Sequence, residues 1–347
     1  MRWLQPVFTL LFAAPCIAAA QSAVVHTDQV RAELVAHAPR GLRPGEPAWL
    51  GLAIAHQPHW HSYWKNPGDS GMATTLRWTL PEGVTAGPIE WPTPQRLPVG
   101  PLVNYGYEGD VLLPVALALP AAHQGATLEV KLHAQWLVCK DVCIPQSGEF
   151  TLKLPSAAST LHVAAFARGR AATPQPLAGA TVLARVQGQD LSVDVSGLPA
   201  PWRGTAAQFF AEDAAVIDHA APVQQHWEGA VLQLRVPLSA QRSESPQSMR
   251  AVLVAAGEPS GVALNFAVEG GWPVPGGAPP QVQAPEAAAA AAATETAAPA
   301  APAMPLLTWL VAILAALALG AFWALRRARR AEPRKDLLPN PTRSEYP

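Results

Sequence analysis

The chain has 347 residues, half of them hydrophobic, and its 24 basic and 25 acidic side chains give a net charge of −1. This balance argues against a nucleic-acid-binding protein, which normally presents a strongly basic face. The sequence also contains no Gly-rich phosphate loop, no nucleophile-elbow motif and no HExxH pair, so the common hydrolase signatures are absent.

Residues 1–20 have the pattern of a secretory signal peptide. A single Arg near the start precedes an apolar run, and the small residues Ala18 to Ala20 suit cleavage by signal peptidase. Cleavage there removes Cys16 and leaves Cys139 and Cys143 as the cysteines of the exported chain. An even cysteine count in an exported protein favours a disulfide over free thiols.

Residues 21–157 and 158–272 are predicted to form two β-sandwiches. In "TLEVKLHAQWLV", residues 127–138, hydrophobic side chains occupy every even position, the period-2 pattern of a strand with one buried face. "TVLARVQGQDLSVDV" alternates in the same way on either side of a turn at 188–190, which predicts a hairpin. With only a short helix fitting between 156 and 176, the pattern indicates an all-β protein with an immunoglobulin-like sandwich and a second sandwich in tandem.

The carboxyl-terminal segments are predicted to anchor the protein in a membrane. Residues 273–304 are rich in Ala and Pro and contain no aromatic residue, so they form a linker and not a core. Residues 305–325 carry no charged side chain and are long enough for a transmembrane helix. The basic tail, residues 326–347, places that end in the cytoplasm by the positive-inside rule and the two sandwiches on the opposite side.

Cys139 and Cys143 stand three residues apart in "WLVCKDVCIP". Both are odd-numbered, whereas the core-facing residues of the preceding strand are even, so strand geometry directs Cys139 away from the main core. Residues 140–142 then form a tight loop that can bring the sulfurs within disulfide distance. A structural staple across so short a loop stabilises by only about 2 kcal/mol. This favours an exposed pair used for thiol exchange, while a staple and a metal-binding pair stay open.

A second cluster is "HQPHWHSYWKNPGDSG", residues 56–71, with three histidines within six positions. On an extended strand His59 and His61 share a face. Together with Cys139 and Cys143 they supply four ligands for zinc or copper(I), which is the metal-binding alternative to a redox pair. The simpler interpretation of this stretch is an aromatic edge strand followed by a turn at "NPGDSG".

The third notable stretch is "WPTPQRLPVGPLVNYGYEGDVLLPV", residues 91–115. Its prolines keep the first part extended, and the Asn, Tyr and Gly residues at 104–109 indicate a turn. Composition alone leaves two interpretations open, an ordinary inter-strand loop or a lid over a site.

These three stretches, in this order, resemble the amino-terminal periplasmic domain of the thiol:disulfide interchange protein DsbD, and more closely its ScsB-like relatives. The residues that carry the resemblance are "HWHSYWKNPGDSG", "WPTPQRLPVGPLVNYGYEGDVLLPV" and "WLVCKDVCIP", within residues 24–154. The resemblance implies an immunoglobulin-like sandwich with one redox-active cysteine pair and no cofactor. Residues 160–272 would correspond to the second sandwich of ScsB-like ectodomains.

By position, the resemblance makes Cys139 and Cys143 the catalytic pair of a thiol:disulfide oxidoreductase, with Cys143 the one that contacts partners. His61 and Tyr63 fall where the family has aromatic residues beside the disulfide, and residues 96–102 fall where it has a cap loop. The family's capping aromatic has no clear equivalent here, so other side chains must shield the sulfurs. The predicted cap and partner residues, besides His61 and Tyr63, are Leu97, Val99, Leu102 and Tyr105.

The resemblance also implies a location and partners. We expect an ectodomain in the bacterial periplasm, anchored to the inner membrane by a single helix. The expected partners are periplasmic thioredoxin-like proteins or disulfide isomerases, including those of cytochrome c maturation or copper tolerance. The family's multi-helix electron-carrying section and thioredoxin-like domain are not found in this sequence, so electrons would come from a separate membrane carrier. The other interpretations are a copper- or zinc-binding module and a non-catalytic scaffold.

Overall fold

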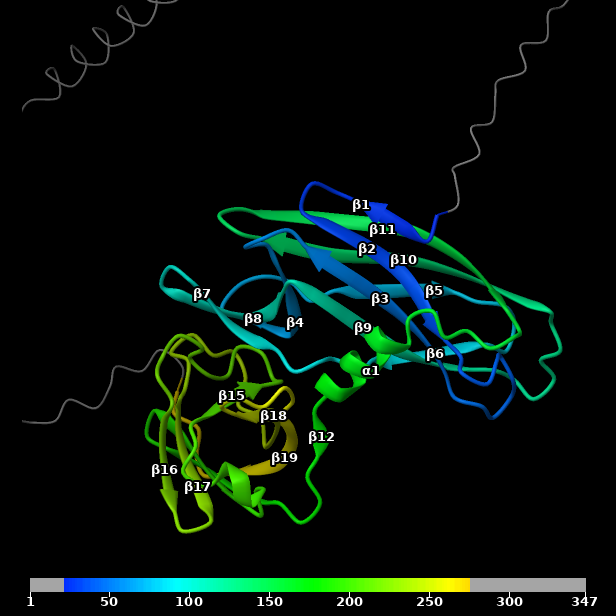
Figure 1. Ribbon diagram of the computed structural model, residues 1–347. Coiled ribbons are helices and arrows are strands. Elements are labelled where there is room, and N and C mark those ends of the chain that lie inside the picture. The colour runs from blue at the N-terminus through cyan, green and yellow to red at the C-terminus, as the bar shows by residue number, and fades with distance from the viewer. Residues whose placement is uncertain (1–21, 275–347) are drawn as a thin grey trace, which may run out of the picture. The chain divides into compact units, whose positions relative to one another are not determined.

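The computed structural model describes residues 22–274, which form two β-sandwich-like units joined by a short helix (Figure 1). Both sandwich-like units belong to the same compact part of the chain. The predicted signal peptide, almost all of the Ala/Pro-rich linker, the predicted transmembrane helix at 305–325 and the basic tail lie outside the described residues. Between residues 22 and 274, no helix is long and apolar enough to cross a membrane.

The first unit consists of two sheets that face one another. One sheet has the strand order β1-β2-β3-β9-β6, and the other has the order β11-β10-β4-β8-β7, with β5 paired to the middle of β10. The bounds of the strands are β1 Val24–His26, β2 Val30–His37, β3 Ala48–His56, β4 His61–Gly68, β5 Thr75–Thr79, β6 Thr85–Ile89, β7 Gln95–Val99, β8 Leu102–Glu108, β9 Asp110–Ala118, β10 Thr127–Cys139 and β11 Cys143–Pro155.

The core of the first unit confirms the alternation predicted for residues 127–138. The even-numbered side chains of β10 are at most 1% exposed and belong to one hydrophobic cluster with Leu50, Leu52 and Ile54 of the opposite sheet. Phe150 on β11 is buried in the same cluster. Because successive side chains of a strand point to opposite faces, burial of the even set directs the odd set away from this core.

The short helix expected between 156 and 176 is present as α1, Val163–Ala172. It packs on the first unit, where Phe166 lies in a small buried cluster with Val35 and Leu112 on the outer face of β2 and β9. The chain therefore keeps contact with the first sandwich beyond the predicted boundary at residue 157, up to the end of this helix.

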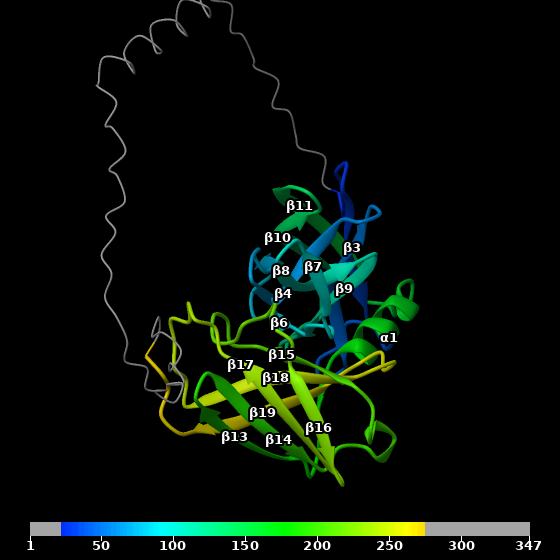
Figure 2. The ribbon, with the colours of Figure 1, turned by 90° about the vertical axis from the view of Figure 1, so that its left-hand side faces the viewer.

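The second unit is built from eight strands. Seven of them form one hydrogen-bonded path, in the order β15-β18-β19-β13-β14-β17-β16, and the eighth, β12, pairs with β19 off this path. Strands β13 to β19 lie in the lower part of the view in Figure 2. The bounds of the eight strands are β12 Gln175–Pro176, β13 Thr181–Gln187, β14 Asp190–Ser196, β15 Ala207–Ala211, β16 Gln224–Glu228, β17 Val231–Pro237, β18 Ser248–Ala255 and β19 Val262–Glu269, with a short 3-10 helix at Ala200–Trp202.

The two halves of this path enclose a second core. Leu191, Val193 and Val195 on β14 are fully buried and cluster with Phe209 on β15 and Leu253 on β18. The hairpin predicted at 188–190 is confirmed, since β13 and β14 pair antiparallel from Gln187 and Asp190 outward.

The turn predicted at residues 104–109 is confirmed only at its last residue. Asn104 to Glu108 are part of β8, and the positive φ values lie on either side of this strand, at Gly100 and Gly109. The Asn104 side chain does not bond its own backbone, as it would in an Asx turn. Its Oδ1 accepts hydrogen bonds from the backbone N–H and the hydroxyl of Ser70, at 3.1 and 3.0 Å, which leaves Asn104 free to continue the strand.

Candidate functional site

The two cysteines close a hairpin between the longest strands of the protein's described part. Cys139 is the last residue of β10, Cys143 is the first of β11, and they pair directly across the hairpin with their Cα atoms 4.1 Å apart. Their sulfurs form a disulfide. The intervening loop is closed by a hydrogen bond of 3.2 Å from the N–H of Lys140 to the carbonyl of Val142. The tight loop predicted from the spacing is confirmed.

The two sulfur-bearing residues differ in exposure. Cys139 is only 2% exposed, whereas Cys143 is exposed and Val142 beside it is 62% exposed. Cys139 lies outside the main hydrophobic cluster, as its odd position predicts, but it does not face solvent. The disulfide therefore offers an incoming group one accessible sulfur and keeps the other covered.

Tyr63 on β4 covers the buried sulfur. Its hydroxyl donates to Sγ of Cys139 at 2.8 Å and lies 3.7 Å from Sγ of Cys143. Its neighbour two residues back, His61, pairs with Cys139 across the β4–β10 contact and is only 4% exposed. The rings of His61 and Tyr63 meet edge to face, with centroids 5.3 Å apart. The predicted aromatic residues of the site are thus beside the disulfide.

The loop after β4 packs against the Tyr63 ring. Gly71 in this loop has φ +107°, and a Cβ at that position would overlap the ring carbons of Tyr63. The loop is tied to β8 by Asp69, whose Oδ2 accepts from the N–H of Val103 at 2.8 Å, and by the Asn104–Ser70 bonds. Sequence reasoning took this segment for a plain turn and missed its contact with Tyr63.

Burial sets the protonation of both aromatic side chains. It raises the pKa of Tyr63, so the phenol stays protonated and remains a hydrogen-bond donor at neutral pH. Burial lowers the pKa of His61, against an opposing effect of the Glu108 carboxylate. The imidazole is therefore neutral at neutral pH, and its Nε2 is buried with no hydrogen-bond partner among the described residues.

The structure does not bring together the four predicted metal ligands. His59 is not on the strand with His61 but in the turn before it, exposed and with φ +70°, so the shared face expected for the two histidines is wrong. A pre-strand turn in the left-handed region breaks the period-2 alternation on which that expectation depended. Among residues 22–274, no group of three or more His, Cys, Asp or Glu side chains is placed to hold a metal ion.

The predicted cap residues occupy the β7–β8 hairpin in different environments. Leu97 is 7% exposed and its Cδ1 lies beside Gly106, the residue paired with Tyr63. Val99 is half-buried near the hairpin turn and Leu102 is 40% exposed. Tyr105 is fully buried on the face of β8 opposite to Gly106. There its ring contacts those of Trp64, Phe210 and His219.

Comparison with known proteins supports this account of the first unit. Residues 29–155 match the family model of the thiol:disulfide interchange protein DsbD, N-terminal. The resemblance predicted from the sequence is confirmed over these residues, which include both cysteines and Tyr63. The family match supports a role in thiol–disulfide exchange, and the cysteine pair that such a role needs is present.

The similarity in fold to a known structure reaches beyond residues 29–155. The crystal structure of the N-terminal periplasmic domain of ScsB from Proteus mirabilis matches with a TM-score of 0.54 and 17% sequence identity, over 72% of this chain and 98% of that chain. Coverage of 72% is more than the first sandwich alone can supply, so the shared fold includes part of the second. No curated protein gives a significant sequence match to the chain.

Proposed function

We propose that this protein is a thiol–disulfide exchange protein of the bacterial periplasm, in which Cys139 and Cys143 alternate between disulfide and dithiol. The observation that carries the proposal is the unequal treatment of the two sulfurs. Cys143 is exposed at a hairpin tip, and Cys139 is buried with its Sγ 2.8 Å from the Tyr63 hydroxyl. A disulfide that served only as a structural staple would need neither an accessible sulfur, as at Cys143, nor a hydrogen-bond donor to the second sulfur, as at Cys139.

The exchange proceeds through a mixed disulfide. A partner thiolate attacks the exposed Sγ of Cys143 and forms a new S–S bond, while the Cys139–Cys143 bond breaks and its electron pair goes to Sγ of Cys139. The partner's second cysteine, as a thiolate, then attacks the partner sulfur that is bonded to Cys143, which forms the partner's own disulfide and releases Cys143 as a thiolate. Two electrons and two protons pass from the partner dithiol to this protein, and the reverse sequence reduces a partner disulfide.

Tyr63 stabilises the leaving group in this sequence. A thiolate leaves faster when its pKa is lower, and a hydrogen bond to the charged form lowers that pKa. The Tyr63 hydroxyl is already in place at Cys139 in the oxidised protein. Because burial raises the pKa of the phenol, Tyr63 donates a hydrogen bond to the thiolate without giving up its proton.

The surrounding organisation follows from the same proposal. The immunoglobulin-like sandwich that begins at residue 21, with α1 packed on it, carries the exchange site. The second sandwich runs from β12 to residue 272, and a helix at 305–325 anchors both to the inner membrane. Partners are periplasmic thioredoxin-like proteins or a disulfide isomerase, with a separate membrane protein as the electron carrier. Support for these partners comes from the family match over residues 29–155.

The test is a redox titration of the full-length chain in glutathione buffers, read by alkylation of free thiols. We expect a reversible two-electron transition that is lost in Cys139→Ser and Cys143→Ser. The single variants then separate the roles of the sulfurs. With Cys139→Ser, the exposed Cys143 thiol should form a mixed disulfide with a thioredoxin-like partner, whereas Cys143→Ser should form little. A pair that resists dithiothreitol and thioredoxin in the folded protein would contradict the proposal.

A further inference from the structure

The second sandwich packs against the strands that hold Tyr63 in place. Its strands β15 and β18 are buried on both faces over residues 209–211 and 251–255. Phe209 and Leu253 belong to the core of the second unit, whereas their neighbours Phe210 and Val252 belong to the hydrophobic cluster of the first. Antiparallel sheets commonly leave one face to solvent, so a second buried face marks a built contact with another element. That element is formed by β4, β7 and β8.

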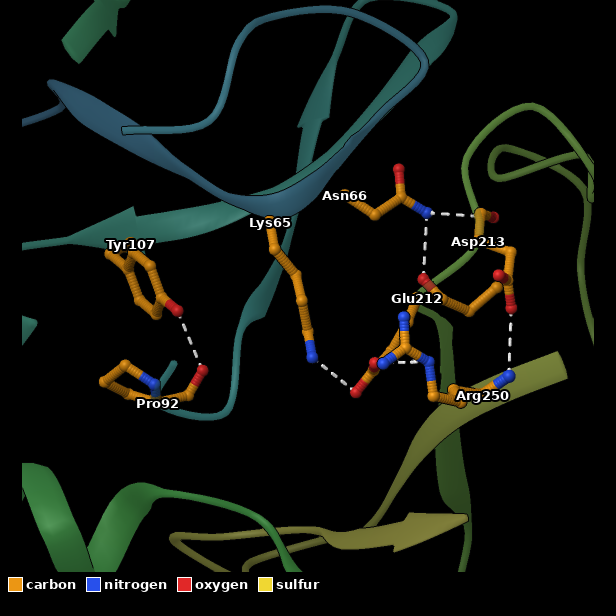
Figure 3. A network of polar contacts seen from close by, with 8 residues as sticks. Lys65, Asn66, Pro92, Tyr107, Glu212, Asp213 and Arg250 are labelled. Atoms are coloured by element: carbon orange, nitrogen blue, oxygen red, sulfur yellow. Dashed lines mark hydrogen bonds and ion pairs between the residues drawn. The ribbon is translucent and has the colours of Figure 1, made fainter. Parts of the chain in front are cut away.

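The contact with β4 includes a fully buried asparagine. The Nδ2 of Asn66 donates to the carbonyl of Ala211 at 2.8 Å and lies 3.4 Å from the carbonyl of Asp213 (Figure 3). Its Oδ1 accepts from the N–H of Gly68 at 3.1 Å. With donors and acceptor both used, the side chain fixes the distance between β4 and the end of β15.

An ion pair lies beside this bond. Lys65 Nζ is 2.5 Å from Glu212 Oε1, and Glu212 is only 10% exposed in its side chain (Figure 3). Arg250 of β18 approaches the same carboxylate at 3.5 Å and so holds it from within the second sandwich. The shielding of Glu212 from water makes this pair stronger than a surface ion pair.

The β7–β8 hairpin is held from the same side. Arg96 on β7 donates through Nη2 to the carbonyl of His219 at 2.8 Å. The ring of Tyr105 on β8 meets Phe210 and His219 edge to face, with centroid distances of 4.9 Å to each. Gly106, the next residue along β8, is the direct partner of Tyr63 on β4.

We propose that the second sandwich positions the exchange site by clamping β4 and the β7–β8 hairpin. Tyr63 and Trp64 are consecutive, so they point to opposite faces of the strand: Tyr63 to the disulfide, and Trp64 to Phe210, 6.3 Å between ring centroids. Movement of β4 relative to β10 moves the Tyr63 hydroxyl relative to Cys139, and the contacts of β4 to the second sandwich restrain this movement. Asn66 and Arg96 are positioning residues that act through Tyr63. This inference rests on the proposed exchange function.

The central variant is Arg96→Ala in the full-length chain, because Arg96 is half-buried and its loss leaves the hydrophobic contact intact. We expect the rate constant for disulfide reduction by dithiothreitol to fall about fivefold, as for a weakened hydrogen bond to the leaving thiolate. Arg96→Lys keeps a donor for the His219 carbonyl and should restore most of the rate. The matched control is Arg235→Ala, which removes an exposed ion pair with Asp190 elsewhere in the second sandwich.

A double-mutant cycle separates positioning from loss of stability. If Arg96 acts through Tyr63, Arg96→Ala should have little further effect on the rate in a Tyr63→Phe background, and its reduction potential should shift in the same direction as that of Tyr63→Phe. Asn66→Ala should have the same effects on the rate and on the reduction potential under conditions in which this variant is folded. Equal reduction rates for the wild type, Arg96→Ala and Arg235→Ala, with a reversible wild-type pair, would overturn the positioning role alone. A wild-type pair that cannot be reduced would overturn the exchange function itself.

Discussion

The hydroxyl of Tyr63 lies 2.8 Å from Sγ of Cys139, a residue 76 positions further along the chain. It is a hydrogen-bond donor held against the buried half of a disulfide whose other half, Cys143, is exposed. In the proposed mechanism Sγ of Cys139 is the leaving group, so this donor favours attack on Sγ of Cys143 over attack on Sγ of Cys139. The geometry therefore makes the two cysteines chemically different although they are direct partners in one hairpin.

Replacing this hydroxyl should slow reduction of the disulfide. A hydrogen bond to a charged group contributes about 1.5–3 kcal/mol, so Tyr63→Phe should lower the rate constant for reduction by dithiothreitol about tenfold or more. Stopped-flow measurement at pH 7.5 gives the rate. Tyr107→Phe is the matched control, because it removes another buried phenol hydroxyl, which donates to the Pro92 carbonyl at 2.8 Å (Figure 3), away from the sulfurs. Equal rates for both variants would show that Tyr63 has no part in exchange.

Gly71→Ala should disturb the same contact by displacing the Tyr63 ring. Two costs combine at this position: φ of +107°, which L side chains avoid, and overlap of the new Cβ with the Tyr63 ring. Gly45→Ala carries only the first cost, since φ is +76° there and nothing lies within 4 Å of an added Cβ. Denaturant unfolding should show a loss of about 1 kcal/mol for Gly45→Ala and a clearly larger loss for Gly71→Ala. Similar losses would mean that the ring yields without strain.

The sequence predicted local features of this protein well. Alternation identified the buried face of β10, the hairpin spacing identified the Cys139–Cys143 loop, and odd parity placed Cys139 off the main core. Each of these depends on residues close together in the chain, where the period of a strand and the reach of a short loop decide the geometry. The resemblance to known exchange domains added His61 and Tyr63, now seen beside the disulfide.

Features that depend on distant pairing were not predictable in this way. Asn104 has the composition of a turn, yet its side chain is used by Ser70, and the strand continues. Asn66 belongs to "NPGDSG", which suggests a solvated loop, but it is fully buried against a carbonyl 145 residues away. At Asn104 a tertiary partner overrides the local preference of asparagine for turns. Asn66 keeps its local bond to the N–H of Gly68 through Oδ1 and uses its Nδ2 for the distant carbonyl. The contact between the two sandwiches, and the position that it gives to Tyr63, depend on residues far apart in the chain and are therefore seen only in the structure.

Acid should destabilise the fold through four histidines, of which His61 and His219 are buried and His37 and His56 are half-buried. Burial lowers the pKa values of His37, His56, His61 and His219 below that of the unfolded chain, about 6.5. Their contribution to stability is therefore fully present above pH 6.5 and is lost as pH falls through the lower folded-state values, because the unfolded chain then binds more protons. We expect the free energy of unfolding, measured with urea, to fall between pH 7.5 and pH 5.

His219 offers a direct check of this sign. It is 3% exposed, and its pKa is lowered by burial and by Arg96 while Asp69 and Asp218 oppose the shift. His219→Gln should therefore reduce the loss of stability on acidification, and His226→Gln, a change at an exposed position on β16, should leave it as in the wild type. A wild-type stability that does not change between pH 7.5 and pH 5 would contradict the prediction.

Exchange with a protein partner should depend on an apolar side chain that a small reductant does not need. Val142 is 62% exposed and directly precedes Cys143, so a partner that reaches this sulfur must cover it. Val142→Ser should lower the rate of reduction by a thioredoxin-like protein about fivefold, equivalent to roughly 1 kcal/mol of lost apolar burial, with the dithiothreitol rate unchanged. Leu183→Ser, at a residue 56% exposed on β13, is the control and should alter neither rate. A fall with both reductants would instead place the effect of Val142 in the hairpin loop itself, because dithiothreitol makes no extended contact with the protein.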